Sequence, residues 1–496
     1  MGKFIKVVLG VLLAIIVLIG FMVIRTVISA DNKSVAHTDV TPPDVTPQLI
    51  DVDADALAQN LAKAIQFKTV TMQNHEDTDW PVFLELQTWL AQTYPNFHNA
   101  VQSQQIKTYA QLHIWQGSDP SLAPIVFLAH QDVVPASEEE NSGWDYPPFD
   151  GIIADGFIYG RGAVDDKGSL ISILEAADRL AASGFTPKRT LMFGFGHDEE
   201  VKGTGAQAIA ELLKTRGIKP YAVIDEGGAI ISGLPGTQSP VAMIGVAEKG
   251  YLTLILKAKA TGGHSSAPPS YTAIGALSKA IVAIENAPFE SGLDIVSTKM
   301  LKAMMVDQSF GKRLAISNLW WFKPLVEDSL RSTPSSNAIL GTTIAPTIID
   351  AGFKENALPR DATAYVNFRI HNRDSIASVT AHVRKAINDP NIEITMSDNI
   401  GSEPSPISQI DAGPYLWLKD VISQSFPNTI IAPNTVIGGT DSRYFSIVTS
   451  DIYRFAPYAI DVSDLSRFHG LNERISVEAY AKAVQVYYLM LEKAGE

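Results

Sequence analysis

Cysteine is absent from all 496 residues of the chain. Its absence excludes disulfide scaffolds, zinc sites built from thiolates and a cysteine nucleophile. Positive charge is also scarce, because 39 Lys and Arg stand against 53 Asp and Glu, for a formal net charge of -14. A chain this acidic is not expected to bind nucleic acid. Internal repeats are missing too, which leaves an ordinary globular composition in a chain long enough for two or three domains.

One long apolar run is present, and it lies at the N-terminus. "VVLGVLLAIIVLIGFMVI", residues 7–24, contains no charge and is flanked by basic residues. This length nearly spans a membrane, whereas the apolar part of a cleaved signal peptide is usually shorter, about 7–15 residues. We therefore expect a signal anchor over 1–29 rather than a cleaved signal or a buried helix. The body would then lie outside the cytoplasm, in a periplasm or lumen. The polar residues 30–49 would form a linker.

Short apolar runs alternate with helical patterns after this linker. Three runs are typical of strands buried on both faces: "PIVFLAH" (124–130), "TLMFGFG" (190–196) and "YAVIDEG" (221–227). The alternation predicts a doubly wound α/β catalytic domain in two parts, residues 50–247 and 404–496.

The pattern changes between residues 248 and 403. Predicted strands and helices follow in the order β-α-β-β-α-β, which is the ferredoxin-like arrangement, with one strand expected over 338–352. A largely helical insert with the sequence "LWWF" interrupts this order at 287–335. We therefore expect a small α+β domain inserted into the larger α/β domain.

Residues with metal-binding side chains follow each of the three apolar runs. They are His130 and Asp132 after the first, Glu199 and Glu200 after the second, and Asp225 and Glu226 within the third. Sites in open α/β sheets form outside the carboxyl ends of the strands, so these side chains are expected to converge. A cluster of carboxylates would be repulsive without cations.

Two further segments supply candidate ligands. The loop "GRGAVDDKG" places Asp165 and Asp166 just before a helix, and His469 lies in "RFHGLNERI" in the second part of the α/β domain. Imidazole and carboxylate ligands without thiolates suit Zn²⁺, with Co²⁺ or Mn²⁺ as alternatives. Two such ions activate a water, and of two adjacent glutamates one binds metal while the other acts as a base.

Together these segments resemble the co-catalytic zinc metallopeptidases of the aminoacylase and carboxypeptidase S type. The matching motifs, which cover about 120–475, are "HQDVVP", "WDYPPFDGIIADGFIYGRGAVDDKG", "GFGHDEEVKGTGA", "VIDEGG", "TGGHSSAPP", "NALP", "GGTDSRYF" and "FHGLNERI". The N-terminal anchor and the helical insert favour the carboxypeptidase S branch. The resemblance implies that the inserted domain is a lid and dimerisation domain, so a homodimer is expected.

The resemblance also implies a role for each site residue, with two zinc ions per subunit. The implied ligands are His130 and Asp225 for one zinc, Glu200 and His469 for the other, and Asp165 for both. Glu226 is the alternative to Asp225, and the bond between Asp165 and Asp166 is expected to be cis. Asp132 would orient His130. Glu199 would be the general base.

Three more residues would contact the substrate. His264 in "TGGHSSAPP" resembles the histidine that stabilises the oxyanion, often from the partner subunit. Asn356 in "NALP" and Arg443 in "GGTDSRYF" would bind substrate, with Arg443 holding a carboxylate by paired hydrogen bonds. Arg369 is the rival for that role.

The expected activity is zinc-dependent cleavage of the amide bond next to a free α-carboxylate in small peptides, as in a carboxypeptidase or dipeptidase. Hydrolysis or synthesis of N-acyl amino acids is the alternative within this class. A non-catalytic protein with the same fold is a second class, which the full set of ligands and the base oppose. A metal-dependent phosphoesterase is a third, and "GGTDSRYF" with the lid histidine favours amides over phosphate esters.

Overall fold

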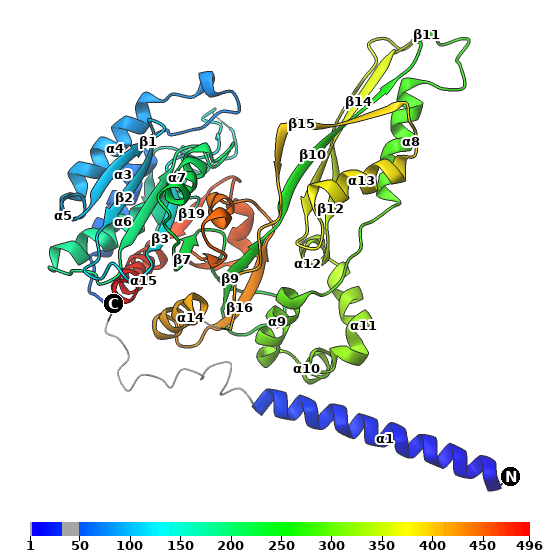
Figure 1. The fold of residues 1–496 in the computed structure, drawn as a ribbon, viewed down its shortest axis with the longest axis horizontal. Coiled ribbons are helices and arrows are strands. Elements are labelled where there is room, and N and C mark those ends of the chain that lie inside the picture. The colour runs from blue at the N-terminus through cyan, green and yellow to red at the C-terminus, as the bar shows by residue number, and fades with distance from the viewer. Residues whose placement is uncertain (1, 32–48, 140, 412) are drawn as a thin grey trace.

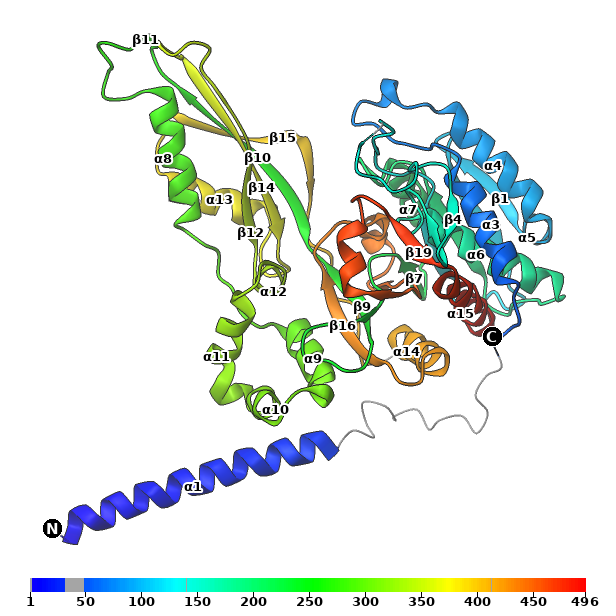
Figure 2. The same ribbon diagram turned by 180° about the vertical axis from the view of Figure 1, so that it is seen from behind.

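The computed structural model describes residues 2–31, 49–139, 141–411 and 413–496 (Figures 1 and 2). A large α/β body contains the strands that precede the candidate ligands. A sheet covered by two helices, here called the lid, projects away from this body, and a group of short helices lies at its base (Figure 1). The separate helix α1 (Gly2–Asp31) approaches that group from below in Figure 1.

The body is built on a ten-stranded sheet. Its strand order is β1-β2-β6-β3-β7-β17-β9-β8-β18, and β16 pairs with β9. In chain order the strands are β1 (Gln102–Ile106), β2 (Ala110–Trp115), β3 (Ile125–His130), β6 (Leu191–Gly196), β7 (Ala222–Asp225), β8 (Ile230–Ser232), β9 (Val241–Glu248), β16 (Ile430–Val436), β17 (Ile452–Arg454) and β18 (Ala459–Asp461). The central strands β6, β3, β7 and β17 run parallel, so their carboxyl ends lie at one edge.

Helices cover both faces of this sheet. On β3, Phe127 and Ala129 join the core packed against α3 (Ala54–Ile65), α6 (Lys167–Ala182) and α15 (Val477–Gly495). Val126 and Leu128 point to the opposite face and pack with α7 (Thr204–Thr215). Successive side chains along a strand point to opposite faces of the sheet. Because helices cover both faces, these strands are apolar at successive positions. The predicted doubly wound layer is confirmed.

Shorter elements complete the body. They are α4 (Pro81–Thr93), α5 (Pro95–Ala100), α14 (Pro414–Ser425), the three-stranded sheet of β4 (Ile152–Ala154), β5 (Phe157–Tyr159) and β19 (Arg474–Ser476), and the 3₁₀ helices η1 (His75–Asp77), η3 (Asp441–Ile447) and η4 (Val462–Arg467).

The lid has the predicted ferredoxin-like order. Its elements are β10 (Gly250–Lys259), α8 (Ala273–Glu285), β12 (Thr343–Ala351), β14 (Asp361–Ile370), α13 (Ile376–Ile387) and β15 (Ile392–Ser402). The strands form an antiparallel sheet in the order β12-β14-β10-β15, and α8 and α13 share its buried core. A two-residue pairing of β11 (Gly263–His264) with β13 (Ala357–Leu358) lies at the far tip (Figures 1 and 2). The limit 247/248 falls before the last residue of β9, and the limit 403/404 falls just after β15. As domain boundaries both stay a prediction.

The insert is helical, as expected. It comprises α9 (Ile295–Met304), η2 (Met305–Asp307), α10 (Phe310–Ser317), α11 (Leu319–Arg331) and α12 (Pro334–Leu340). The strand expected over 338–352 is wrong at its start, because its first residues belong to α12. Thr333 caps that helix by accepting a hydrogen bond from the Ser336 backbone, and Pro334 suits its first turn.

Helix α1 is long and apolar enough to cross a membrane over Lys3–Ile28, by length and composition. A signal sequence meets the same criterion. Only 6% of its most apolar window is buried, which opposes the alternative of a buried core helix. The expected linker lies almost entirely outside the described residues, since residues 32–48 are not described.

Candidate metal centre

His130 ends the buried strand β3, and Asp132 fixes the direction of its ring. The His130 Nδ1 atom lies 3.3 Å from the Asp132 Oδ1 atom and 3.0 Å from the Asp132 backbone oxygen. The Asp132 carboxylate also accepts hydrogen bonds from the backbone N–H groups of Glu199 and Glu200, each at 3.1 Å, and from the Thr71 hydroxyl at 2.7 Å. Asp132 therefore joins the end of β3 to the loop after β6 and leaves His130 Nε2 facing the cleft.

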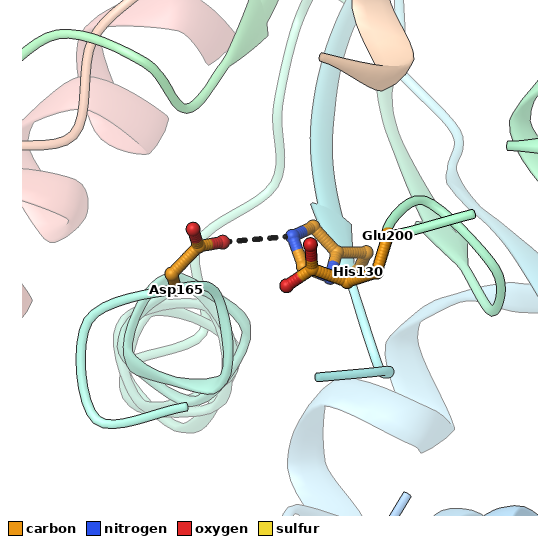
Figure 3. A group of neighbouring side chains, drawn as sticks. All are labelled: His130, Asp165 and Glu200. Carbon is orange, nitrogen blue, oxygen red and sulfur yellow. Dashed lines mark hydrogen bonds and ion pairs between the residues drawn. The ribbon is translucent and has the colours of Figure 1, made fainter. Parts of the chain in front are cut away.

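Asp165 lies between two histidines. Its Oδ1 atom is 3.2 Å from His130 Nε2 (Figure 3). Its Oδ2 atom is 2.9 Å from His469 Nε2. The peptide bond to Asp166 is cis, as the resemblance implied. One carboxylate thus offers each of its oxygens to a different imidazole, which is the geometry required of a residue that bridges two cations.

Glu200 completes the group from the opposite side. Its Oε2 atom lies 3.2 Å from His469 Nε2, and Figure 3 shows its side chain beside His130. The Glu200 Oε1 atom is buried and has no hydrogen-bond partner among the residues that the structure describes. A buried carboxylate oxygen without a partner is costly, so this atom is a candidate to bind an ion.

The third strand offers two adjacent carboxylates that point in different directions. Asp225 is buried, and its Oδ2 atom accepts a hydrogen bond of 2.7 Å from the Ser442 backbone. The Glu226 Oε1 atom instead lies 3.5 Å from His130 Nε2. Two sets of ligand atoms lie within 4.8 Å of one another in the described chain, namely His130 with Asp165 and Glu200, and His130 with Glu199 and Glu226. The geometry therefore favours the alternative, Glu226, over Asp225 as the neighbour of His130.

The electrostatics of the cluster favour added positive charge. Burial raises the pKa of Glu226 well above its usual value, and burial also raises the pKa of Glu200. Hydrogen bonds to Asp165 and Glu200 raise the pKa of His469 to about 10. Carboxylates and imidazoles that hold a proton this strongly also favour a cation in its place. Nitrogen and oxygen are suitable ligands for divalent cations of the zinc type.

Glu199 lies beside this cluster and next to an arginine. Its Oε1 atom is 3.3 Å from Arg443 Nη1, and Arg443 also donates a 3.0 Å hydrogen bond to the Thr440 backbone oxygen. Burial raises the pKa of Glu199 to about 8, despite the nearby Arg443 and His130. A carboxyl group with a pKa in this range both accepts and releases a proton near neutral pH, as a general base and acid must.

Two cavities meet at the cluster. The first has a volume of about 510 Å³, and its lining includes Glu199, Glu200, Arg443, His469 and the lid residues Tyr251 and Arg369. The second has about 490 Å³, and its lining includes Asp165, Glu226 and the apolar side chains of Met243, Val436, Ile460 and Phe468. Arg369 lines both cavities, with its guanidinium 5.0 Å from the centre of the Tyr251 ring. Charged side chains thus contribute to the first cavity, the lining of the second is largely apolar, and the candidate ligand His469 lines both.

Comparison with known proteins decides the family. The model of the peptidase family M20/M25/M40 matches residues 126–493. The chain belongs to this family. It is therefore a hydrolase of a metal-dependent peptidase family, and the resemblance to carboxypeptidase S-type enzymes is confirmed by its relatives.

Two curated relatives and one solved structure show the range of the family. The probable carboxypeptidase S-like 2 of Dictyostelium discoideum is 36% identical over 92% of this chain and 88% of its own. The N-fatty-acyl-amino acid synthase/hydrolase PM20D1 of Homo sapiens is 38% identical over 88% of both chains. A metallo-carboxypeptidase from Sulfolobus solfataricus has the same fold, with a TM-score of 0.66 at 16% identity over 88% of this chain and 99% of its own.

His264 and Asn356, two of the expected substrate contacts, do not lie beside the metal cluster of their own chain. His264 belongs to β11 and Asn356 directly precedes β13, so both are exposed at the tip of the lid, far from the body (Figure 1). The Asn356 backbone oxygen accepts a hydrogen bond from Ser265, which holds the two residues in one unit. Within a single chain this unit does not meet the metal cluster.

Glu473 was missed by the sequence analysis although it lies inside the motif "FHGLNERI". Its Oε1 atom accepts hydrogen bonds from the backbone N–H groups of Gly162, Val164 and Asp165 at 2.9–3.1 Å, and Arg161 donates to its other oxygen. Glu473 therefore shapes the loop that presents Asp165. Its charge was visible in the sequence, but its partners are more than 300 residues away.

Replacing Glu473 with glutamine is expected to lower the free energy of unfolding by about 3 kcal/mol, because Arg161 would stay buried without its counter-charge. Both side chains are almost fully buried, with 1% and 3% exposed. Denaturant unfolding of the purified chain measures the change. The exposed Glu211→Gln is the matched control, expected within about 0.5 kcal/mol of the wild type. Equal stability of the two variants would contradict the role given to Glu473.

Proposed function

We propose that the chain hydrolyses the amide bond next to a free α-carboxylate in small peptides, as a carboxypeptidase or dipeptidase does. One observation carries the proposal: Glu199, whose side chain is 9% exposed, lies between a cluster of histidines and carboxylates on one side and Arg443 on the other. These are the parts needed to activate water, accept its proton and hold a carboxylate in one cavity.

The residues proposed to hold two metal ions, zinc being the expected metal, form two groups. They are His130 and Glu226 for one ion, Glu200 and His469 for the other, and Asp165 for both, with Glu226 replacing the expected Asp225. When bound, these ions would polarise the scissile carbonyl and lower the pKa of a water. Asp132 orients the ring of His130 through Nδ1.

Glu199 takes the proton from the attacking water and delivers it to the leaving amine in this scheme. Only 9% of the Glu199 side chain is exposed, so its carboxyl group is largely shielded from bulk solvent while it holds the proton. Arg443 faces the same cavity and presents its guanidinium to the substrate carboxylate.

Arg443→Ala is expected to lower kcat/KM for substrates with a free carboxylate by about 10- to 100-fold, the usual effect of losing a charged hydrogen bond. The matching substrate amides should be affected much less. Arg369→Ala is the control, since Arg369 also lines this cavity but contacts the Tyr251 ring. If Arg369→Ala alone discriminates between acids and amides, the rival arginine holds the carboxylate.

A second candidate function has an observation of its own. The 490 Å³ cavity beside Asp165 and Glu226 is lined by apolar side chains, which suits the acyl chain of an N-acyl amino acid. Human PM20D1, whose name describes hydrolysis and synthesis of N-fatty-acyl amino acids, is 38% identical. The zinc-loaded chain should therefore be tested against dipeptides and N-acyl amino acids of increasing chain length. Faster turnover of long acyl chains would favour this function, and turnover of phosphate esters alone would contradict both.

The tip of the lid supports a homodimer in which each lid serves the partner's site. His264 is exposed and far from its own cluster, so its oxyanion role requires the cluster of the partner subunit. Mixing His264→Ala with Glu199→Gln subunits is expected to restore up to about a quarter of the wild-type sites, since random mixing leaves one intact composite site in half of the dimers. The assay compares the mixture with each variant alone. No recovery in subunits proved to exchange would contradict the shared site.

A membrane anchor is the last part of the proposal. The apolar helix α1 would hold the body outside the cytoplasm, and the exposure of its apolar residues supports a lipid environment.

A further inference from the structure

Helix α11 presents apolar side chains to the outside. None of its residues is buried, and Trp320, Trp321 and Leu325 are 51%, 57% and 62% exposed. Trp321 and Leu325 are one turn apart and therefore share a face. Phe310, the first residue of the preceding helix α10, is 47% exposed. An outward cluster of this kind normally marks a surface that contacts something else.

The end of α1 packs against the same insert. Met22 and Thr26, one turn apart on α1, are among its few buried residues, with 5% and 1% exposed. Asn318, which joins α10 to α11, donates hydrogen bonds from Nδ2 to the Met22 backbone oxygen at 3.2 Å and to the Thr26 hydroxyl at 3.3 Å. Figures 1 and 2 show α10 next to this end of α1. The insert is thus fixed to the last turns of the candidate membrane span.

This contact sets the depth of the insert. The candidate span ends at Ile28, so Met22 and Thr26 lie within about two turns of its end, at roughly 5.4 Å per turn. Asn318 would then lie near the boundary between hydrocarbon and headgroups, where tryptophan is enriched in membrane proteins. The exposed Lys312 on α10 suits anionic headgroups.

We propose that Phe310, Trp320, Trp321 and Leu325, here called the aromatic surface, insert into the lipid interface of the membrane that α1 crosses. The inference rests on the anchor proposed above. Lipid is the favoured occupant because the Trp320 indole donates a 3.3 Å hydrogen bond to the side chain of Asn318, the residue that binds the span. A second copy of the chain is the rival occupant, which the experiment must distinguish.

The absence of cysteine makes this surface directly measurable. Trp321→Cys in the full chain is labelled with an environment-sensitive fluorophore and reconstituted into vesicles of phosphatidylcholine and phosphatidylserine. Leu325→Cys provides a second position on the same face. Leu84→Cys is the matched control, because Leu84 is a large apolar residue with 45% exposure on α4 of the body. Nitroxide-labelled phosphatidylcholine and a water-soluble quencher report the surroundings of each label.

Lipid nitroxide is expected to quench the labels at 321 and 325 at least about fivefold more strongly than the label at 84, since only the labels at 321 and 325 would lie at interfacial depth. Equal quenching at all three positions would overturn the inference. So would labels at 321 and 325 that are protected from both quenchers, which would indicate a second copy. If the chain does not float with the vesicles, α1 is not a membrane anchor, and this inference fails together with the anchor. Amide hydrolysis is measured on the same samples, so failure of the chemistry is seen separately.

Discussion

Replacing Glu199 with glutamine is expected to lower kcat by about 10³-fold while the metal content stays near that of the wild type. Glutamine has the shape of glutamate but cannot accept the proton of the attacking water. The proposed ligands do not include Glu199, whose carboxylate lies 3.3 Å from Arg443. Steady-state kinetics and elemental analysis of the same preparation measure both quantities.

Glu200→Gln is the matched control because it changes the adjacent residue in the same way. Glu200 contacts His469 at 3.2 Å and has a buried oxygen without a partner, so this variant is expected to lose metal as well as activity. If Glu199→Gln also lost metal, Glu199 would be a ligand. The ion would then be held by the candidate group in which ligand atoms of His130, Glu199 and Glu226 lie within 4.8 Å of one another.

Replacing Glu226 with alanine is expected to lower activity by more than about 10²-fold and to release one metal ion per subunit. Loss of a ligand weakens metal binding more than loss of a residue that only orients a ligand. Glu226 lies 3.5 Å from His130, on the same side as Asp165. Activity and metal content across a range of added zinc measure the loss, and excess zinc should restore part of it.

The variant Asp225→Asn tests whether Glu226, as proposed, or Asp225, as the resemblance implied, binds the metal. Asp225 accepts a hydrogen bond from the Ser442 backbone, which asparagine can also accept through its oxygen. The variant should therefore keep both ions, with stability lowered by about 1 kcal/mol at most. Loss of an ion in Asp225→Asn, with none lost in Glu226→Ala, would restore Asp225 as the ligand.

The adjacent residues Asp225 and Glu226 show which part of the site the sequence could not predict. Continuous apolar runs were enough to place β3, β6 and β7 in a buried parallel sheet, and hence to bring His130 and Glu200 to one edge. The strand β7 ends at Asp225, and the turn after it decides which of two adjacent carboxylates faces the cleft. Side chains alternate only while the strand continues, so periodicity cannot assign Glu226.

Contacts between residues far apart in the sequence could not be predicted from it either. The motif around His469 includes Glu473, yet the hydrogen bonds from the Asp165 loop to Glu473 depend on the fold alone. His264 and Asn356 were selected by resemblance, and their exposure at the lid tip could not be derived from local sequence. The contact of Asn318 with α1 joins residues almost 300 positions apart.

The central claim is that side chains from distant segments hold two neighbouring cations. Anomalous diffraction at the zinc edge from crystals of the zinc-loaded protein tests it most directly. We expect two peaks per subunit about 3.5–4 Å apart. One should lie about 2.0–2.2 Å from ligand atoms of His130, Glu226 and Asp165, and the other equally near Asp165, Glu200 and His469. A single peak, or peaks that these five side chains do not surround, would contradict the account.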